Sequence, residues 1–192
     1  MCIWFFLNTV KNNFANISGI DINESAVKYA KDTLKLNVSS EDFLNVEKQK
    51  ISNIDIFCMF DVIEHLVDPN KIINKINNES KIGSYIIITT GDISSFNARI
   101  NGANWRLIHP PSHIHYFKKK TINKLLKKNN FEIISISYCG YYRNLSFILN
   151  KIEFIKKYLK IMIKILTYLR ILKYDIYLNL FDIMLVIARK TK

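Results

Sequence analysis

Glycine is scarce in this sequence, with five residues in 192, and none of them precedes Gly19. A glycine-rich loop that brings the backbone close to a ligand is therefore excluded from the residues before Gly19. Long apolar runs are also missing: no uncharged apolar stretch reaches the roughly 18 residues of a transmembrane helix. Neither a basic leader nor a small-residue cleavage site follows Met1, so we do not expect a secretory signal peptide.

Cysteine is equally sparse, and its three residues are far apart. Cys2, Cys58 and Cys139 form no Cys-x-x-Cys pair, which argues against a disulfide framework and against a zinc site of standard spacing. A reducing, cytoplasmic setting fits this usage best. Cys58 lies within an apolar run and is expected to be a small core residue.

The remaining composition is that of a globular protein, with 49% hydrophobic and 23% charged residues. We expect one domain over residues 1–192. The formal charge of +12 could suit nucleic acid or an anionic membrane surface. The lysines, however, are spread along the chain and gather mainly in 118–128 and the C-terminal third, as on solvated helix faces. Nucleic-acid binding is therefore not expected.

Helical and strand patterns alternate along the chain, which predicts an α/β fold with a parallel sheet and helices on both of its faces. The apolar runs at 54–60 and 85–90 are typical of parallel strands that are buried on both faces. Asp68 and Pro69 predict a helix start, and Thr121 predicts another. Residues 92–117 have little periodicity and are expected to form a long functional loop.

Acidic residues follow three of the predicted strands, where ligands bind in open α/β sheets. Asp21 ends the first of these strands, and its two carboxylate oxygens could accept both hydroxyls of a ribose. Asp42 and Phe43 would suit an adenine, with the carboxylate on the exocyclic amine and the ring covered by an apolar neighbour. Asp21 could instead cap a helix, and Asp42 could be an ordinary surface residue.

Histidines supply the second set of candidates. Glu64 and His65 follow a predicted strand and could serve acid–base chemistry or form a structural hydrogen-bonded pair. His109, His113 and His115 fall within a short segment, and one of them could face a substrate. Their spacing matches no standard zinc pattern, so no metal site is predicted.

These segments together resemble the class I S-adenosylmethionine-dependent methyltransferases, a broad family that includes the ubiquinone-biosynthesis O-methyltransferases and many sugar and small-molecule methyltransferases. The matching words are Gly19 to Ala26, Asp61 to Leu66 with Asp68-Pro69, and Trp105 followed by Pro111 to Phe117. Asn130 to Glu132 and Asp182 to Lys190 complete the ordered set. A nicotinamide-dependent oxidoreductase would also place an acid after its second strand, but these words fit it poorly.

The resemblance implies a Rossmann-like, doubly wound and mostly parallel sheet, S-adenosylmethionine as cofactor, and methyl transfer to a small-molecule, sugar or lipid-linked acceptor. Asp21 would hold the ribose, and the edge of the methionine pocket would lie at Phe60. The cofactor-binding residues that it implies are Asp21, Ile22, Asp42, Phe43, Phe60 and Asp61. The catalytic candidates for an acceptor that must lose a proton are His113, His115 and His65, with His113 lining the substrate side.

One departure from the family concerns its first strand and the Gly-x-Gly loop after it. Residues 1–7 match the end of that loop and the next helix, and Trp4 stands where an indole would intrude on the cofactor. We therefore expect a domain that lacks the first strand and glycine-rich loop and is N-terminally incomplete. Two alternatives follow: a non-catalytic, truncated methyltransferase-like protein that cannot bind cofactor, or a basic membrane-associated module.

Residues 145–173 are predicted to form a basic amphipathic helical insertion before the last strand. One interpretation is a helix lying on an anionic membrane near a lipid-linked acceptor. The other is a lid helix packed on the sheet, with its lysines in water. The expected location is accordingly the cytoplasm, with peripheral contact to the inner face of the membrane under the first interpretation.

Overall fold

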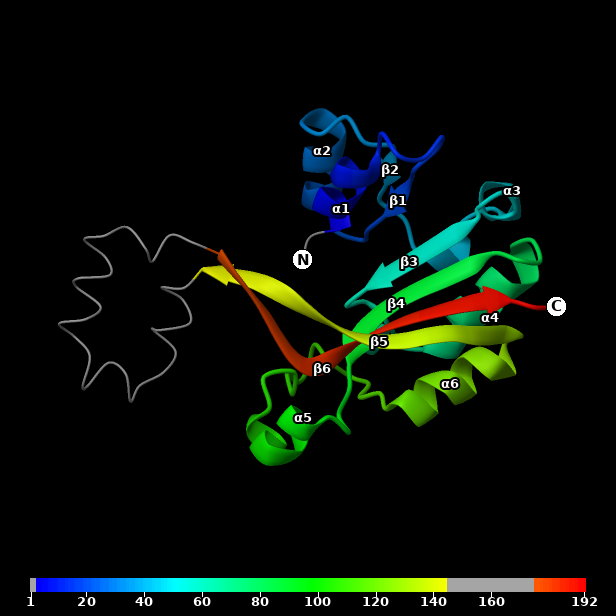
Figure 1. Cartoon of the computed structure of the whole chain (residues 1–192). Helices are drawn as coiled ribbons and strands as arrows, with labels where there is room; N and C mark the ends of the chain where they lie inside the picture. Colours follow the sequence, from blue (N-terminus) through cyan, green and yellow to red (C-terminus); the bar gives the residue numbers. More distant parts are fainter. Residues whose placement is uncertain (1–2, 145–174) are drawn as a thin grey trace, which may run out of the picture.

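The computed structural model describes residues 3–144 and 175–192 and has the α/β architecture that the sequence predicts (Figure 1). The helices and single 3₁₀ turns are α1 (Ile3–Val10), α2 (Glu24–Asp32), η1 (Phe43–Asn45), α3 (Lys48–Ile51), η2 (Ile63–His65), α4 (Pro69–Glu79), α5 (Phe96–Asn101), η3 (Gly102–Asn104) and α6 (Lys119–Lys128). The strands are β1 (Gly19–Ile20), β2 (Val38–Ser39), β3 (Ile56–Phe60), β4 (Tyr85–Gly91), β5 (Phe131–Asn144) and β6 (Asp175–Lys190).

The N-terminal region, residues 3–39, has a small core of its own. The strands β1 and β2 pair in parallel over two residues each. Asn23 caps α2, as its position predicts, by accepting a hydrogen bond from the amide of Ala26. The buried residues of this N-terminal core are Trp4, Leu7, Val27, Ala30, Leu36 and Val38.

Trp4 is one of the most buried side chains of this region, with 1% of its surface exposed. A Cβ atom at Gly19 would lie 2.7 Å from the Trp4 ring and 2.8 Å from Leu7, so the absence of a side chain at Gly19 makes room for both. The indole thus fills the N-terminal core, and its intrusion on a cofactor remains a prediction.

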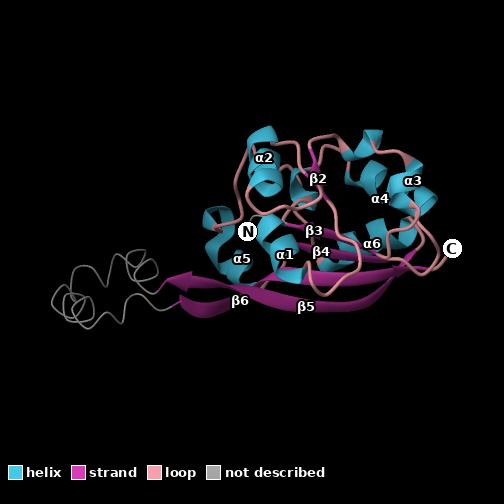
Figure 2. Ribbon diagram, turned by 90° about the horizontal axis from the view of Figure 1, so that it is seen from above, coloured by secondary structure: helices cyan, strands magenta, loops and turns pink. Residues whose placement is uncertain are grey.

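The main sheet has the strand order β3-β4-β6-β5 and is mixed, so the prediction of a mostly parallel sheet was wrong. Only β3 and β4 are parallel in it, whereas β6 runs antiparallel to both of its neighbours. The apolar pattern of a strand does not encode its direction, which depends on how the strands are connected and paired. Figure 2 shows β5 and β6 continuing together as a two-stranded ribbon beyond the rest of the sheet.

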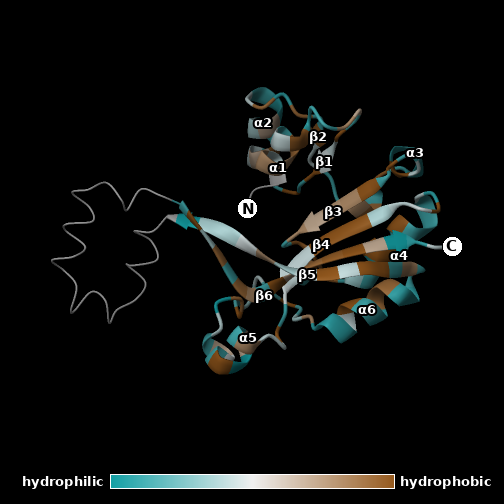
Figure 3. Cartoon of the chain, viewed as in Figure 1, coloured by the Kyte–Doolittle hydropathy of each residue, from teal (hydrophilic) through white to brown (hydrophobic). Residues whose placement is uncertain are grey.

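Burial alternates along β4 and along the second half of β6, and only one face of the sheet is fully covered. Ile86, Ile88 and Val186 point to that face and share one core with residues of α4 and α6. The other face is half-buried, so the prediction that the runs at 54–60 and 85–90 are buried on both faces was wrong. Figure 3 shows the apolar residues concentrated in the strands of this sheet.

Of the two predicted helix starts, the one at Asp68 and Pro69 is confirmed and the one at Thr121 is wrong. Asp68 caps α4 by accepting a hydrogen bond from the amide of Lys71, with Pro69 in the first turn. Thr121 does not begin α6: the helix starts at Lys119, and the Thr121 hydroxyl accepts a hydrogen bond from the amide of Lys118. The stretch 92–117 is not a featureless loop, because it contains α5 and η3.

The structure tests only part of what the sequence predicts for the chain termini and the insertion. The predicted helix at 145–173 lies outside the described residues. Within residues 3–144 and 175–192, no helix is long and apolar enough to cross a membrane. In the same part of the chain no hydrogen-bonded strand joins β1 and β2 to the main sheet. An N-terminally incomplete domain remains a prediction.

Candidate functional site

Asp21 directly follows β1 and is half-buried. Its backbone amide still pairs with Ser39 of β2, and its Oδ1 accepts a hydrogen bond of 2.9 Å from the amide of Asn23. Among the described residues, none donates a hydrogen bond to Asp21 Oδ2. Ile22, the next residue, is 83% exposed. The strand end therefore offers an acceptor oxygen beside an uncovered apolar side chain.

Asp42 and Phe43 follow β2 in a single 3₁₀ turn. The Asp42 carboxylate caps this turn by accepting a hydrogen bond of 2.9 Å from the amide of Leu44. Asp42 is exposed and Phe43 is half-buried against the main core. The sequence predicted an adenine contact or an ordinary surface residue at Asp42, and did not predict this cap, which occupies only one of the two carboxylate oxygens.

Phe60 and Asp61 end β3 in a strained turn. Asp61 has a φ of 54°, in the left-handed region that costs a non-glycine residue about 1 kcal/mol or more. Thr89 of β4 holds it there, because the Thr89 hydroxyl donates to Asp61 Oδ1 at 2.9 Å. The Phe60 ring meets Phe6 of α1 edge to face, with centroids 4.9 Å apart. Backbone strain that neighbours maintain in this way is common at functional sites.

The turn η2 after β3 places Glu64 inside the protein and His65 on its surface. The Glu64 carbonyl accepts hydrogen bonds from the amides of Ile114 and His115, at 3.0 and 3.1 Å. These bonds bring His113 against His65, with ring centroids 4.6 Å apart. The structure thus joins two predicted histidines that are far apart in the sequence.

Burial raises the pKa of the Glu64 carboxyl above its ordinary value, although hydrogen bonds from its own amide and from the Thr90 hydroxyl oppose the shift. Only 5% of Glu64 is exposed. Its Oε2 atom has no hydrogen-bond partner among the described residues.

His115, the third histidine candidate, lies apart from this pair. Its Nε2 is 3.5 Å from the carbonyl of Val67, at the limit of a hydrogen bond, and its ring lies beside Phe117. His109 interacts with Ser112 and lies at the edge of the group, 6.0 Å from the His113 ring. Of the three catalytic candidates, the structure brings together His65 and His113 and does not bring His115 to them.

Sequence reasoning missed Thr89 and Thr90 as site residues. Both end the apolar run of β4, and they act on Asp61 and Glu64 respectively. Their position at the end of a strand parallel to β3 was the available signal, since the ends of parallel strands lie together. Glu64 itself was noticed beside His65, but its burial could not be seen without the packing of residues 113–115.

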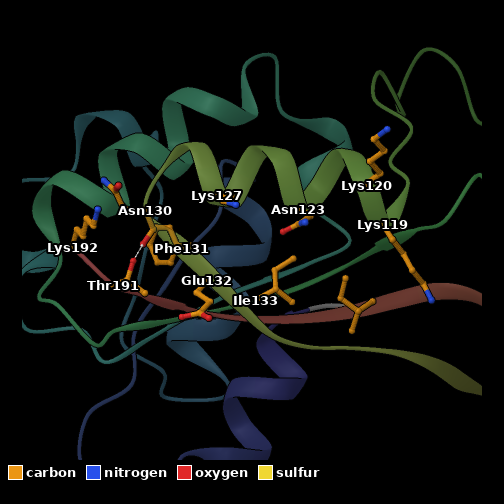
Figure 4. A pocket seen from close by; sticks show the side chains of 11 residues that line it. Lys119, Lys120, Asn123, Lys127, Asn130, Phe131, Glu132, Ile133, Thr191 and Lys192 are labelled. Atoms are coloured by element: carbon orange, nitrogen blue, oxygen red, sulfur yellow. Dashed lines mark hydrogen bonds between the residues drawn. The ribbon is translucent and has the colours of Figure 1, made fainter.

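A groove of about 900 Å³ lies elsewhere, between α6 and the start of β5. It contains none of the predicted site residues, and Figure 4 shows Lys120 and Lys192 at its two ends. The groove is lined by Lys119, Lys120, Asn123, Lys127, Asn130, Phe131, Glu132, Ile133, Ile136, Thr191 and Lys192. We assign it no part in the candidate site.

Comparison with known proteins gives one family and many similar folds. The model of a methyltransferase domain family matches residues 2–136. An S-adenosylmethionine-dependent methyltransferase from Thermotoga maritima is 14% identical with a TM-score of 0.60, over 97% of this chain and 76% of that one. A second, from Archaeoglobus fulgidus, is 20% identical with a TM-score of 0.59, over 96% of this chain and 80% of that one.

A third similar structure contains a ligand. Magnesium protoporphyrin IX methyltransferase from Synechocystis, solved with bound S-adenosylhomocysteine, is 14% identical with a TM-score of 0.55, over 95% of this chain and 68% of that one. At these identities the likeness concerns the fold. No curated protein matches the chain.

Proposed function

The chain belongs to the methyltransferase domain family, and we propose that it transfers a methyl group from S-adenosylmethionine to a small-molecule, sugar or lipid-linked acceptor. The acceptor's identity is not encoded in any feature described above. The observation that carries the proposal is Asp21, which follows β1 with one carboxylate oxygen held in its turn and the other without a donor among the described residues.

The residues after β1 and β2 fit the adenosyl part of such a cofactor. Asp21 Oδ2 would accept a hydrogen bond from a ribose hydroxyl, and the exposed Ile22 would cover apolar surface of the cofactor beside it. The carboxylate of Asp42 and the ring of Phe43 would meet the adenine end. When bound, the cofactor supplies an electrophilic methyl group on a positively charged sulfur.

Phe60 and Asp61 would border the methionine end. The edge-to-face contact with Phe6 fixes the Phe60 ring, and the Thr89 hydroxyl fixes the Asp61 carboxylate. Such preorganised groups can orient an acceptor against the methyl group, and much of the rate of an in-line displacement can come from orientation.

His65 and His113 would lie on the acceptor side. Each ring has its Nδ1 within 2.8 Å of a backbone carbonyl, which leaves the lone pair of Nε2 available. A lone pair there can act on the proton of an acceptor hydroxyl. His115 remains a candidate by the family resemblance alone.

Calorimetric titration of the purified chain with S-adenosylhomocysteine tests the proposal. We expect binding to weaken by roughly 10- to 100-fold in Asp21→Ala, because a hydrogen bond to a charged group contributes about 1.5–3 kcal/mol. Asp32→Ala is the matched control, since Asp32 is exposed at the end of α2 and should leave binding unchanged.

A folded wild-type chain that does not bind S-adenosylhomocysteine would contradict the proposal. The non-catalytic alternative, which the absence of glycine before Gly19 motivates, would then be preferred. Equal loss of binding in Asp21→Ala and Asp32→Ala would show that the effect is not specific to the strand end.

A further inference from the structure

We propose that Glu64, His65 and His113 bind a divalent transition-metal cation. One donor atom of each residue, a carboxylate oxygen or a ring nitrogen, lies within 4.8 Å of the other two. Glu64 and His65 come from η2 and His113 from the stretch before α6, and the Glu64 carbonyl joins these two segments. The sequence predicted no metal site, because the spacing of His109, His113 and His115 matches no standard zinc pattern.

The hydrogen bonds of the two imidazoles fix which nitrogen is free. His65 Nδ1 lies 2.7 Å from the carbonyl oxygen of Ser112, and His113 Nδ1 lies 2.8 Å from that of Leu107. A carbonyl oxygen only accepts, so each Nδ1 must carry the hydrogen. In the neutral ring Nε2 is then an unprotonated donor to a metal. Metal-binding histidines in proteins are commonly held in this way by a backbone carbonyl on the opposite nitrogen.

Glu64 supplies the independent observation. The residue is 95% buried, and its Oε2 has no hydrogen-bond partner among the described residues. A buried carboxylate oxygen without a donor is costly, because this oxygen has lost its hydration and gained no hydrogen bond in return. Among the described residues, no lysine or arginine forms a salt bridge with Glu64. A cation held between Glu64 and the two imidazoles would satisfy this oxygen.

The donor set selects the class of cation. Two imidazole nitrogens and one carboxylate suit Zn²⁺, Co²⁺, Mn²⁺ or Fe²⁺, whereas Mg²⁺ and Ca²⁺ prefer oxygen ligands. Ligand atoms around a tetrahedral ion lie about 3.3 Å apart, given metal–ligand distances near 2.0–2.1 Å. The donors would therefore close by roughly an ångström or more, and the exposed side chain of His65 has the freedom to move.

Three protein ligands leave a coordination position open, as in catalytic rather than structural metal sites. A hydroxyl oxygen of the acceptor would take that position, and the cation would lower the pKa of this hydroxyl. The cation would then replace the imidazoles as the group that acts on the acceptor, because their Nε2 lone pairs are bound to it. The site thus favours an acceptor that is methylated on oxygen. This last step rests on the proposed methyl transfer, whereas binding of the cation does not.

Cobalt binding to the metal-free full-length chain tests the site, with the visible absorption of Co²⁺ as the readout. We expect one Co²⁺ per chain with the absorption of a low-coordinate nitrogen-containing site, and competition by Zn²⁺. His113→Ala and Glu64→Gln should each weaken binding by at least about tenfold. The matched control is His109→Ala, which removes a histidine of the same segment that is outside the cluster.

Thermal unfolding with and without Zn²⁺ guards against variants that are merely misfolded. The metal should raise the Tm of the wild type and of His109→Ala, and leave that of a folded His113→Ala unchanged. Equal Co²⁺ affinity in wild type and His113→Ala would overturn the site, as would a folded wild type without Co²⁺ absorption. S-adenosylhomocysteine binding without Co²⁺ binding would overturn the metal site alone; Co²⁺ binding without S-adenosylhomocysteine binding would overturn the methyl transfer alone.

Discussion

The N-terminal region and the main sheet differ in how much core supports them. In the N-terminal region, β1 and β2 pair over two residues each, whereas β6 alone spans 16 residues between two neighbours. Among the described residues, the buried core of the N-terminal region has 6 members and that of the main sheet has 17. Yet this region carries Asp21 and Ile22, which are proposed to bind the ribose side of the cofactor.

The smaller core of the N-terminal region is expected to lower its local stability. Few buried residues give a region a low local stability, and binding regions are often drawn from that end of the range. The main sheet has a large apolar core and a buried, hydrogen-bonded carboxylate, so it can hold strained residues such as Asp61 in place. A ligand that bound the N-terminal region would stabilise it by mass action.

The largest expected effect on stability concerns the buried carboxylate of Asp182 in the main sheet. Asp182 of β6 is 1% exposed, pairs with Arg106, and accepts hydrogen bonds from Asn97 and Trp105. Asp182→Ala should lower the free energy of unfolding by about 3–5 kcal/mol, because it leaves the Arg106 charge and two polar groups without their partner. Urea denaturation measures the change.

Asp55→Ala is the control for this substitution, since it breaks a solvent-exposed ion pair with Lys81. Its expected cost is below about 1 kcal/mol. If the two variants lose similar amounts of unfolding free energy, Asp182 does not hold residues 92–117 to the sheet. The proposed difference in stability between the two regions would then be contradicted.

A matched pair of valine substitutions tests the contrast directly. Val186 of β6 is fully buried in the sheet core, and Val27 of α2 is 4% exposed in the N-terminal core. Val186→Ala should lower the free energy of unfolding of the sheet by roughly 1–3 kcal/mol. Val27→Ala should speed hydrogen exchange in α1 and α2 while the amides of β4 and β6 keep their protection.

Native-state hydrogen exchange followed by mass spectrometry distinguishes these outcomes. If both substitutions accelerate exchange equally throughout the chain, the protein unfolds as one cooperative unit and the two regions are not separable in stability.

The smallest effect concerns the half-buried face of the sheet. Cys58 of β3 is on the same face as Phe60, whose ring contacts Phe6 of the N-terminal region. Burial raises the pKa of the Cys58 thiol to about 11, so thiolate forms only as the pH approaches that value. At pH 8.5 we expect Cys58 alkylation to be roughly two orders of magnitude slower than in the urea-unfolded chain.

Peptide mapping after iodoacetamide treatment gives the rate for Cys58 separately, with the unfolded chain as reference. Val27→Ala should increase the rate if opening of the N-terminal region uncovers this face. Folded and unfolded chains that react at the same rate would show that the face is open to solvent.

The local features of the fold could be predicted where a single segment decides them. Asn23 and Asp68 cap helices through hydrogen bonds three residues along the chain, and the strands β3 and β4 follow from short apolar runs. The start of α6 was misjudged because a threonine at the third helical position can resemble a cap in sequence. Strand direction and the one-sided burial of the sheet involve distant segments and were wrongly predicted.

For this protein the sequence by itself determined the α/β class, the family resemblance, and the acidic residues that end β1 and β3. These depend on local propensity and on the order of short motifs, which the chain carries without folding. Tertiary structure alone decided that His65 and His113 meet beside a buried Glu64 and that Trp4 fills a core. The physical reason is that burial and the convergence of side chains arise from packing between distant segments, and no local pattern records them.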